Sequence, residues 1–154
     1  MPNPMKRAQA LQPISREHHH GLLLCWKIRE GLRLKINPTR IKRYTEWFWT
    51  TSLHEHFNIE EMHIFPILGN ENDLIKKALK EHHRLQQLFT FTDENIEQNL
   101  VQIEQELTAH IRFEERILFN EIQQVASEQQ LSHVEKTHRP KPTKNWDDEY
   151  WIQL

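Results

Sequence analysis

Two segments of the sequence repeat one pattern, in which a histidine is followed four residues later by a pair of glutamates. They read His56-x-x-x-Glu60-Glu61 and His110-x-x-x-Glu114-Glu115. On a helix, residues four apart lie one above the other on the same face. An imidazole and a carboxylate from each of two helices, pointing into one core, form the start of a metal site.

A second repeated pattern adds one histidine to each half of the chain. The segments are Arg16-Glu17-His18-His19 and Lys80-Glu81-His82-His83. The spacing of the neighbouring apolar residues places His18 and His82 inward, with His19 as the alternative to His18. The repeated patterns therefore predict that each half of the chain forms one helical hairpin carrying half of a site.

The inward polar residues occupy positions where the apolar pattern calls for an apolar side chain. They are His18, His56, Glu60, His82, His110 and Glu114. Burying two ionised carboxylates without partners is costly, and two cations would offset that cost. Imidazole and carboxylate suit iron, zinc, copper or manganese, and six such ligands are too many for one tetrahedral zinc. They fit two metals bridged by both carboxylates, with room for an oxo or hydroxo bridge and a further ligand.

Four helices are expected to position these residues, because apolar side chains recur at spacings of three and four. Their inward stripes include Leu22 and Ile117. The predicted helices run from after Pro13, with Ser15 as N-cap, to before Asn37; from Pro38 or Thr39 to about Leu68; from about Asp73 to Phe89; and from a cap at Thr92 or Asp93 to about Ala126. Short connections between the last three favour an all-α, up-down-up-down four-helix bundle.

The flanking segments complete the predicted organisation: a polar arm over residues 1–12, the bundle over 13–127, and a short helix with a tail over 128–154. A capping-box pattern at Ser127 predicts that the short helix runs to about Glu135. The tail residues Trp146, Tyr150 and Trp151 are too apolar to stay in solvent, so we expect them to dock on the bundle or on a second subunit. Three further histidines, His54, His133 and His138, are expected to be solvated.

The composition argues against several classes of function and location. A net charge of -2 over 154 residues gives no reason to expect binding to nucleic acid or to a membrane. The longest apolar run, Leu22 to Trp26, is far shorter than a membrane span. A single cysteine excludes an intramolecular disulfide, and the first residues do not resemble a secretory signal, so we expect a cytoplasmic protein.

The order of these motifs resembles the hemerythrin family, in particular the bacterial hemerythrin-like HHE cation-binding domains, over about Ile14 to Gln124. The resemblance implies a non-haem di-iron centre in a four-helix bundle that binds or senses oxygen, nitric oxide, redox state or iron. The implied ligands are His18, His56, Glu60, His82, His110 and Glu114, with the iron ions bridged by Glu60 and Glu114. Zinc or manganese is an alternative metal, and aromatic residues of the second helix or the tail could form a homodimer.

Two departures from the oxygen-carrying members affect this expectation. Those proteins have a second histidine where this chain has Gln86, and their last carboxylate would correspond to Glu115 rather than Glu114. A missing ligand favours sensing, redox chemistry or labile metal binding over oxygen carriage. We expect Glu61 and Glu115 to orient ligand histidines, and they remain the alternative ligands to Glu60 and Glu114. One alternative function is a di-iron enzyme that acts as a peroxidase or repairs iron-sulfur clusters, and another is a metal-free interaction module. The Glu-x-x-His pattern of ferritin-like di-iron proteins is missing from the fourth predicted helix.

Overall fold

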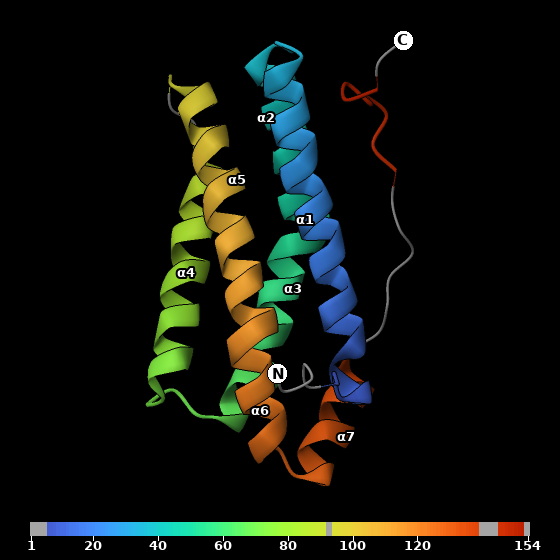
Figure 1. Ribbon diagram of the computed structural model, residues 1–154, viewed down its shortest axis with the longest axis vertical. Helices are drawn as coiled ribbons and strands as arrows, with labels where there is room; N and C mark the ends of the chain where they lie inside the picture. The colour runs from blue at the N-terminus through green and yellow to red at the C-terminus, as the bar shows by residue number, and fades with distance from the viewer. Residues whose placement is uncertain (1–5, 92–93, 139–144, 153–154) are drawn as a thin grey trace, which may run out of the picture.

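The computed structural model describes residues 6–91, 94–138 and 145–152, and within these ranges it contains helices and turns but no strand (Figure 1). The predicted all-helical class is therefore confirmed. The elements are η1 (Gln9–Leu11), α1 (Gln12–Arg33), α2 (Pro38–Phe48), η2 (Trp49–Leu53), α3 (His54–Ile59), η3 (Glu60–Ile64), η4 (Phe65–Ile67), α4 (Asp73–Thr90), α5 (Ile96–Phe113), η5 (Glu114–Leu118), α6 (Phe119–Val125) and α7 (Glu128–Thr137). Among the described residues, no helix has the length and apolar character that crossing a membrane requires.

Helix α1 begins earlier than the sequence indicated. Ser15 is not its N-cap: it lies inside the helix, and its hydroxyl donates a hydrogen bond to Glu115. The preceding Leu11 is fully buried, so the described part of the expected polar arm, residues 6–12, packs on the helices. The helix ends where Lys35 takes a left-handed backbone conformation, with φ of 59°, which stops helical propagation.

The following helices start at side-chain caps. Asn37 accepts a hydrogen bond from the backbone N–H of Thr39, and Asn72 accepts one from that of Leu74. The N-cap of α5 is Asn95, which accepts from the N–H of Gln98. The predicted cap at Thr92 or Asp93 was therefore wrong, and those two residues lie outside the described ranges.

Residues 38–67 form one long helical segment with two π-helical turns, η2 and η3, and residues 96–125 form another with one such turn, η5. A π turn adds one residue to the helical register and rotates everything that follows it. Consequently Leu118 and Phe119 are buried and Ile117 is 49% exposed, so the prediction that Ile117 faces inward was wrong.

Close packing of α1 on α5 explains a second difference. Leu22 is 38% exposed, and Gly21 occupies the inward position instead. A Cβ at Gly21 would lie 2.8 Å from Ile111 Cδ1, so the glycine allows the two helices to approach. The long helical segments lie side by side along the molecule's long axis, and α7 lies near one end (Figure 1).

The apolar core consists of two clusters, and every long helical segment contributes to both. In α1, Ile14 belongs to one cluster and Leu24 to the other, with His18 between them. In α4, Ala78 and Leu85 flank His82 in the same way. The inward polar residues therefore form a layer between two apolar clusters.

Helix α7 begins after the predicted capping box, in which the Ser127 hydroxyl accepts from the N–H of Gln130. The tail packs beside α1 and α2 of the same chain. Tyr150 donates a hydrogen bond to the carbonyl of Lys27 over 3.1 Å, and the ring centroids of Trp146 and Tyr44 lie 6.0 Å apart.

Candidate metal centre

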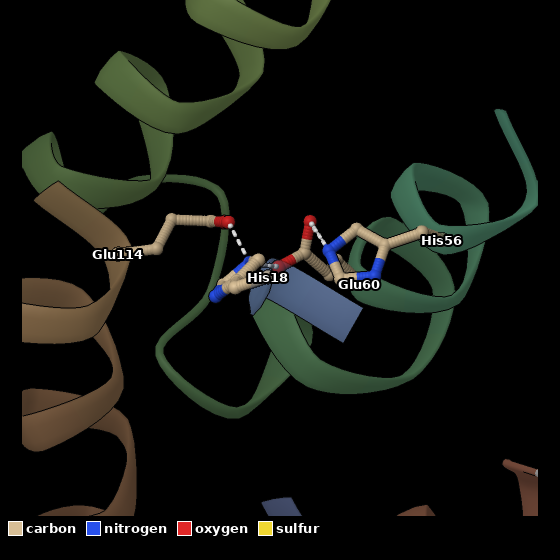
Figure 2. Close-up of side chains that lie close together, drawn as sticks. All are labelled: His18, His56, Glu60 and Glu114. Carbon is tan, nitrogen blue, oxygen red and sulfur yellow. Dashed lines mark hydrogen bonds and ion pairs between the residues drawn. The ribbon is translucent and has the colours of Figure 1, made fainter. Parts of the chain in front are cut away.

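The structure brings all six predicted inward residues together in the layer between the two apolar clusters. None of them is more than 5% exposed, and Glu60 and Glu114 are completely buried. Figure 2 shows four of the six, with His18 lying between Glu114 and the pair formed by His56 and Glu60. Each long helical segment contributes at least one of the six side chains.

The six side chains form two overlapping groups of four, and each group could hold one ion. The groups are His18, His56, Glu60 and Glu114, and Glu60, His82, His110 and Glu114. Within each group the possible ligand atoms lie within 4.8 Å of one another. Both carboxylates belong to both groups, which is the arrangement that two bridged metal ions require.

Every Nε2 atom of the four histidines faces a carboxylate oxygen of this layer. The His18 Nε2 lies 3.0 Å from Glu114 Oε1, and the His110 Nε2 lies 3.2 Å from the same atom. The Nε2 atoms of His56 and His82 lie 3.4 and 3.2 Å from Glu60 Oε1. Four imidazoles therefore converge on two carboxylates.

Most of these converging atoms make no hydrogen bond. The unbonded atoms are Nε2 of His56, His82 and His110, both carboxylate oxygens of Glu60, and Oε2 of Glu114. A buried polar atom without a partner costs on the order of 1–3 kcal/mol, and native proteins contain few of them. Nitrogen and oxygen atoms gathered in this way fit a metal ion, which would satisfy them together.

A second set of carboxylates surrounds the layer, and one of them faces the Nδ1 atom of each histidine. The hydrogen bonds run from His56 to Glu17 over 2.9 Å, from His82 to Glu61 over 2.8 Å and from His110 to Glu81 over 2.7 Å, and Glu115 lies 3.4 Å from His18. A carboxylate at Nδ1 fixes the tautomer, leaves the Nε2 lone pair free for a metal, and makes it more basic.

These outer carboxylates form a closed ring around the helices, because each helical segment orients the histidine of a neighbour. Glu17 of α1 reaches α3, Glu61 of η3 reaches α4, Glu81 of α4 reaches α5, and Glu115 of η5 returns to α1. The sequence predicted this role for Glu61 and Glu115. It did not predict Glu17 and Glu81, although both directly precede an inward histidine.

The charges of the layer shift its pKa values strongly. Burial opposes protonation of His56, but the charge of Glu60 and the hydrogen bond to Glu17 outweigh it and raise the pKa of His56 to about 9. Burial likewise opposes protonation of His110, and Glu114 and Glu81 raise its pKa to about 9. The pKa of Glu60 is lowered well below its usual value, because the histidine charges overcome the effect of its burial.

Phenylalanine rings form an apolar wall around the imidazoles. Phe57 stacks on His82 with ring centroids 3.8 Å apart and an interplanar angle of 9°. Phe119 stacks on His18 at 5.4 Å, and Phe65 lies 5.3 Å from His82. Such rings exclude water from the polar layer, which strengthens the electrostatic interactions inside it.

Both buried carboxylates begin a π turn. The N–H of Phe65 bonds the carbonyl of Glu60, and the N–H of Phe119 bonds the carbonyl of Glu114. Turns of this kind occur frequently at functional sites. The two halves of the site therefore share a π turn as well as a residue pattern.

The remaining candidates lie away from the layer or at its edge. His19 and His83 are exposed, so the inward choice of His18 and His82 agrees with the structure. Gln86 is also exposed, and Leu85 takes the buried position nearby. His138 is 6% exposed and lies 3.3 Å from Glu17, so the expectation that it is solvated was wrong.

Comparison of the chain with models of protein families, with curated proteins and with solved structures finds no significant match in any of the three.

Proposed function

We propose that this chain is a metal-binding protein of the hemerythrin-like type, with a centre of two metal ions. Iron is the preferred metal. The observation that carries the proposal is that two groups of four possible ligands share two fully buried carboxylates. Four histidines then complete the set, two at each ion. Zinc or manganese is the alternative metal, since both accept imidazole and carboxylate ligands.

The proposed scaffold is an up-down-up-down four-helix bundle. Its four members are α1, the segment over residues 38–67, α4, and the segment over residues 96–125. Helix α5 packs on α1, α2 and α4, and the long segments run side by side in Figure 1. The order of inward residues along these segments matches the resemblance noted in the sequence.

The chain's own residues define what the centre could do. Bound iron would supply redox chemistry and a coordination position open to a small ligand such as oxygen or nitric oxide. His56, His82 and His110 are held by outer carboxylates, and the phenylalanine rings exclude water. No fifth histidine completes the set at position 86, where Gln86 is exposed. We therefore favour sensing or labile metal binding over oxygen carriage.

A metal-free interaction module accounts less well for the layer. Ion pairs alone would have to neutralise two fully buried carboxylates, yet both oxygens of Glu60 lack hydrogen bonds. The Nε2 atoms of His56 and His82 lie 3.4 and 3.2 Å from Glu60 Oε1, and that of His110 lies 3.2 Å from Glu114 Oε1; none of the three makes a hydrogen bond. That arrangement suits ions between the atoms better than direct ion pairs.

Metal analysis with an optical spectrum tests the proposal. Protein expressed in iron-rich medium should carry two iron ions per chain and show charge-transfer bands in the near-ultraviolet. Glu60→Ala should lose both ions, because Glu60 belongs to both groups, while helical circular dichroism is kept.

His19→Ala and His83→Ala are matched controls, because each removes an exposed histidine next to an inward one. Both should keep two ions. Wild-type protein that contains no metal and melts at the same temperature with and without added iron would contradict the proposal. A Glu60→Ala variant that retains its metal would show that the ligand set is wrong.

A further inference from the structure

The two candidate metal positions differ in what holds their outer carboxylates. Glu115 and Glu17 orient His18 and His56, which belong to one group of ligands. Each of these two glutamates also contacts a residue from outside the long helical segments. Glu115 Oε2 lies 3.1 Å from an Arg7 guanidinium nitrogen, and Glu17 Oε2 lies 3.3 Å from His138 Nε2.

Arg7 fastens the segment before α1 to the end of the 96–125 segment. Its guanidinium donates to the backbone carbonyl of Glu115 over 2.7 Å and to the Asn120 side chain over 3.2 Å. It also lies over the ring of Phe119, 5.4 Å from the centroid, and that ring stacks on His18. Arg7 therefore contacts both neighbours of His18, the outer carboxylate and the stacking ring.

His138, which follows α7, contacts Glu17 as Arg7 contacts Glu115. It caps the C-terminal end of α7, where its backbone N–H donates to the Val134 carbonyl over 3.1 Å. Val134 is 1% exposed and belongs to the apolar cluster that contains Ile14, together with Leu11 and Phe65. The packing of α7 therefore sets the position of the His138 ring beside Glu17.

The second candidate position is held from within the helices. Glu81, which orients His110, has its further contact with Lys77, one turn earlier in the same helix. Glu61, which orients His82, is 39% exposed. The carboxylates of this half therefore do not depend on the segments that flank the four long helical segments in the way that Glu17 and Glu115 do.

We infer that Arg7 and His138 are positioning residues for one metal ion of the pair, the ion at His18 and His56, and that docking of the two flanking segments controls its retention. The inference rests on the proposed two-metal function. The ion at His82 and His110 is retained by the helices alone. Loss of the Arg7 contact or the His138 contact would therefore leave one tightly held ion in a folded protein.

Titration of the metal-free, full-length protein with Fe²⁺ in the absence of oxygen tests the inference, with calorimetry for affinity and iron counting after gel filtration. Wild type should bind two ions tightly. Arg7→Ala and His138→Ala should keep one tight ion and bind the other more weakly, by up to about 10–100-fold, the range for losing the outer partners of metal ligands that these two residues hold in place. His138→Gln, which keeps an N–H near the position of Nε2, should recover part of the affinity.

Lys77→Ala is the matched control, because it removes a contact of the other half, and it should keep the ion at His18 and His56 tight. Double variants identify the ion that is lost. Arg7→Ala combined with His56→Ala should still bind one ion tightly, whereas Arg7→Ala combined with His82→Ala should bind none tightly.

Three results would overturn the inference: two tight ions in both single variants, equal weakening of both ions, or loss of the last tight ion in the double variant with His56→Ala. Circular dichroism and melting of the metal-free variants establish that they fold. Wild-type protein that binds no Fe²⁺ would overturn the proposed function itself, which separates that failure from failure of this inference.

Discussion

Each of the four central histidines lies between two carboxylates, one at each ring nitrogen. For His110 these are Glu81 at Nδ1 and Glu114 at Nε2. The inner carboxylate can share a metal ion with the imidazole, while the outer one can only orient the ring and raise its basicity. The two roles can be separated experimentally, because the outer carboxylates are partly exposed and the inner ones are fully buried.

Replacing Glu81 by glutamine should weaken metal binding without unfolding the protein. The side chain keeps its size but loses the charge that faces His110 Nδ1 at 2.7 Å. We expect affinity for one ion to fall about 10–100-fold, measured by competition with a chelator. Glu106→Gln is the control, because Glu106 pairs with Arg84 at the surface. Equal affinities in the two variants would contradict a role for Glu81 at the site.

The histidine pKa values predict that the metal-free protein becomes less stable as pH rises. His56 and His110 have pKa values of about 9 in the folded protein, above the ordinary value of 6.5. The folded state therefore keeps protons that the unfolded state releases, and this stabilisation, complete below pH 6.5, is lost as pH rises through 9. Between pH 6.5 and 8 the free energy of unfolding should fall by on the order of 2–4 kcal/mol.

Urea denaturation of the chelator-treated protein at several pH values measures this slope. The window ends at pH 8 because burial lowers the pKa of Lys42 to about 8, and that group adds the opposite slope above it. A variant with glutamine at both positions 56 and 110 should show a shallower dependence. Stability that is constant or rises over the window would show that these histidines are not protonated in the metal-free protein.

The inner residues could be predicted from the sequence because burying a histidine or glutamate breaks an apolar pattern. His18 and Glu114 stand where an apolar residue belongs, and both are buried. Glu17 and Glu81 break no pattern, since a charged residue on the flank of a helix is ordinary. His138 likewise follows a polar helix, and its burial depends on how α7 packs.

At the scale of elements, the π turns carry information that periodicity could not supply. A helical stripe assumes a constant rotation per residue, and η3 and η5 each add one residue directly at a buried carboxylate. The stripes that contain His56 and Glu60, which follow η2, and His110 and Glu114, which η5 does not precede, lie inward as predicted. Beyond Glu114 the prediction chose Ile117, and the structure buries Leu118 and Phe119 instead.

Deleting Met62 tests the extra residue that η3 accommodates. Met62 lies within η3 and is 68% exposed, so its own side chain contributes little. Because the deletion removes the one residue that the π turn adds, an ordinary helical turn would hold Ile64 and Phe65 in their buried positions. We expect the free energy of unfolding to change by less than about 1 kcal/mol, since no large apolar side chain becomes exposed.

Met62→Ala is the control for this deletion, and it should change stability by less than about 0.5 kcal/mol because the site is exposed. Urea denaturation followed by circular dichroism compares the two variants with wild type. A loss of about 3–6 kcal/mol in the deletion variant alone would contradict this, because it would show that Ile64 and Phe65 had left their buried positions.

At the scale of the whole molecule, the candidate centre joins segments that are distant in sequence. His18 and Glu114 are 96 residues apart, yet they are hydrogen bonded in one layer between the two apolar clusters. This layer contains buried polar atoms that make no hydrogen bond, and each such atom lowers stability until a partner binds it. Bound ions would satisfy these atoms and connect all four long helical segments.

Removal of metal should therefore lower the melting temperature of the entire protein, in one cooperative step. An ion that binds only the folded state adds about 2.7 kcal/mol at a free concentration of 100 times its dissociation constant, so two ions would add about 5 kcal/mol. For a chain of this size the difference corresponds to a shift of about 10–20 °C. Thermal melts with excess Fe²⁺ without oxygen, and with a chelator, measure it. Glu60→Ala should melt at one temperature under both conditions, because Glu60 belongs to both groups of ligands. A shift of equal size in Glu60→Ala would place the stabilising ions elsewhere in the molecule.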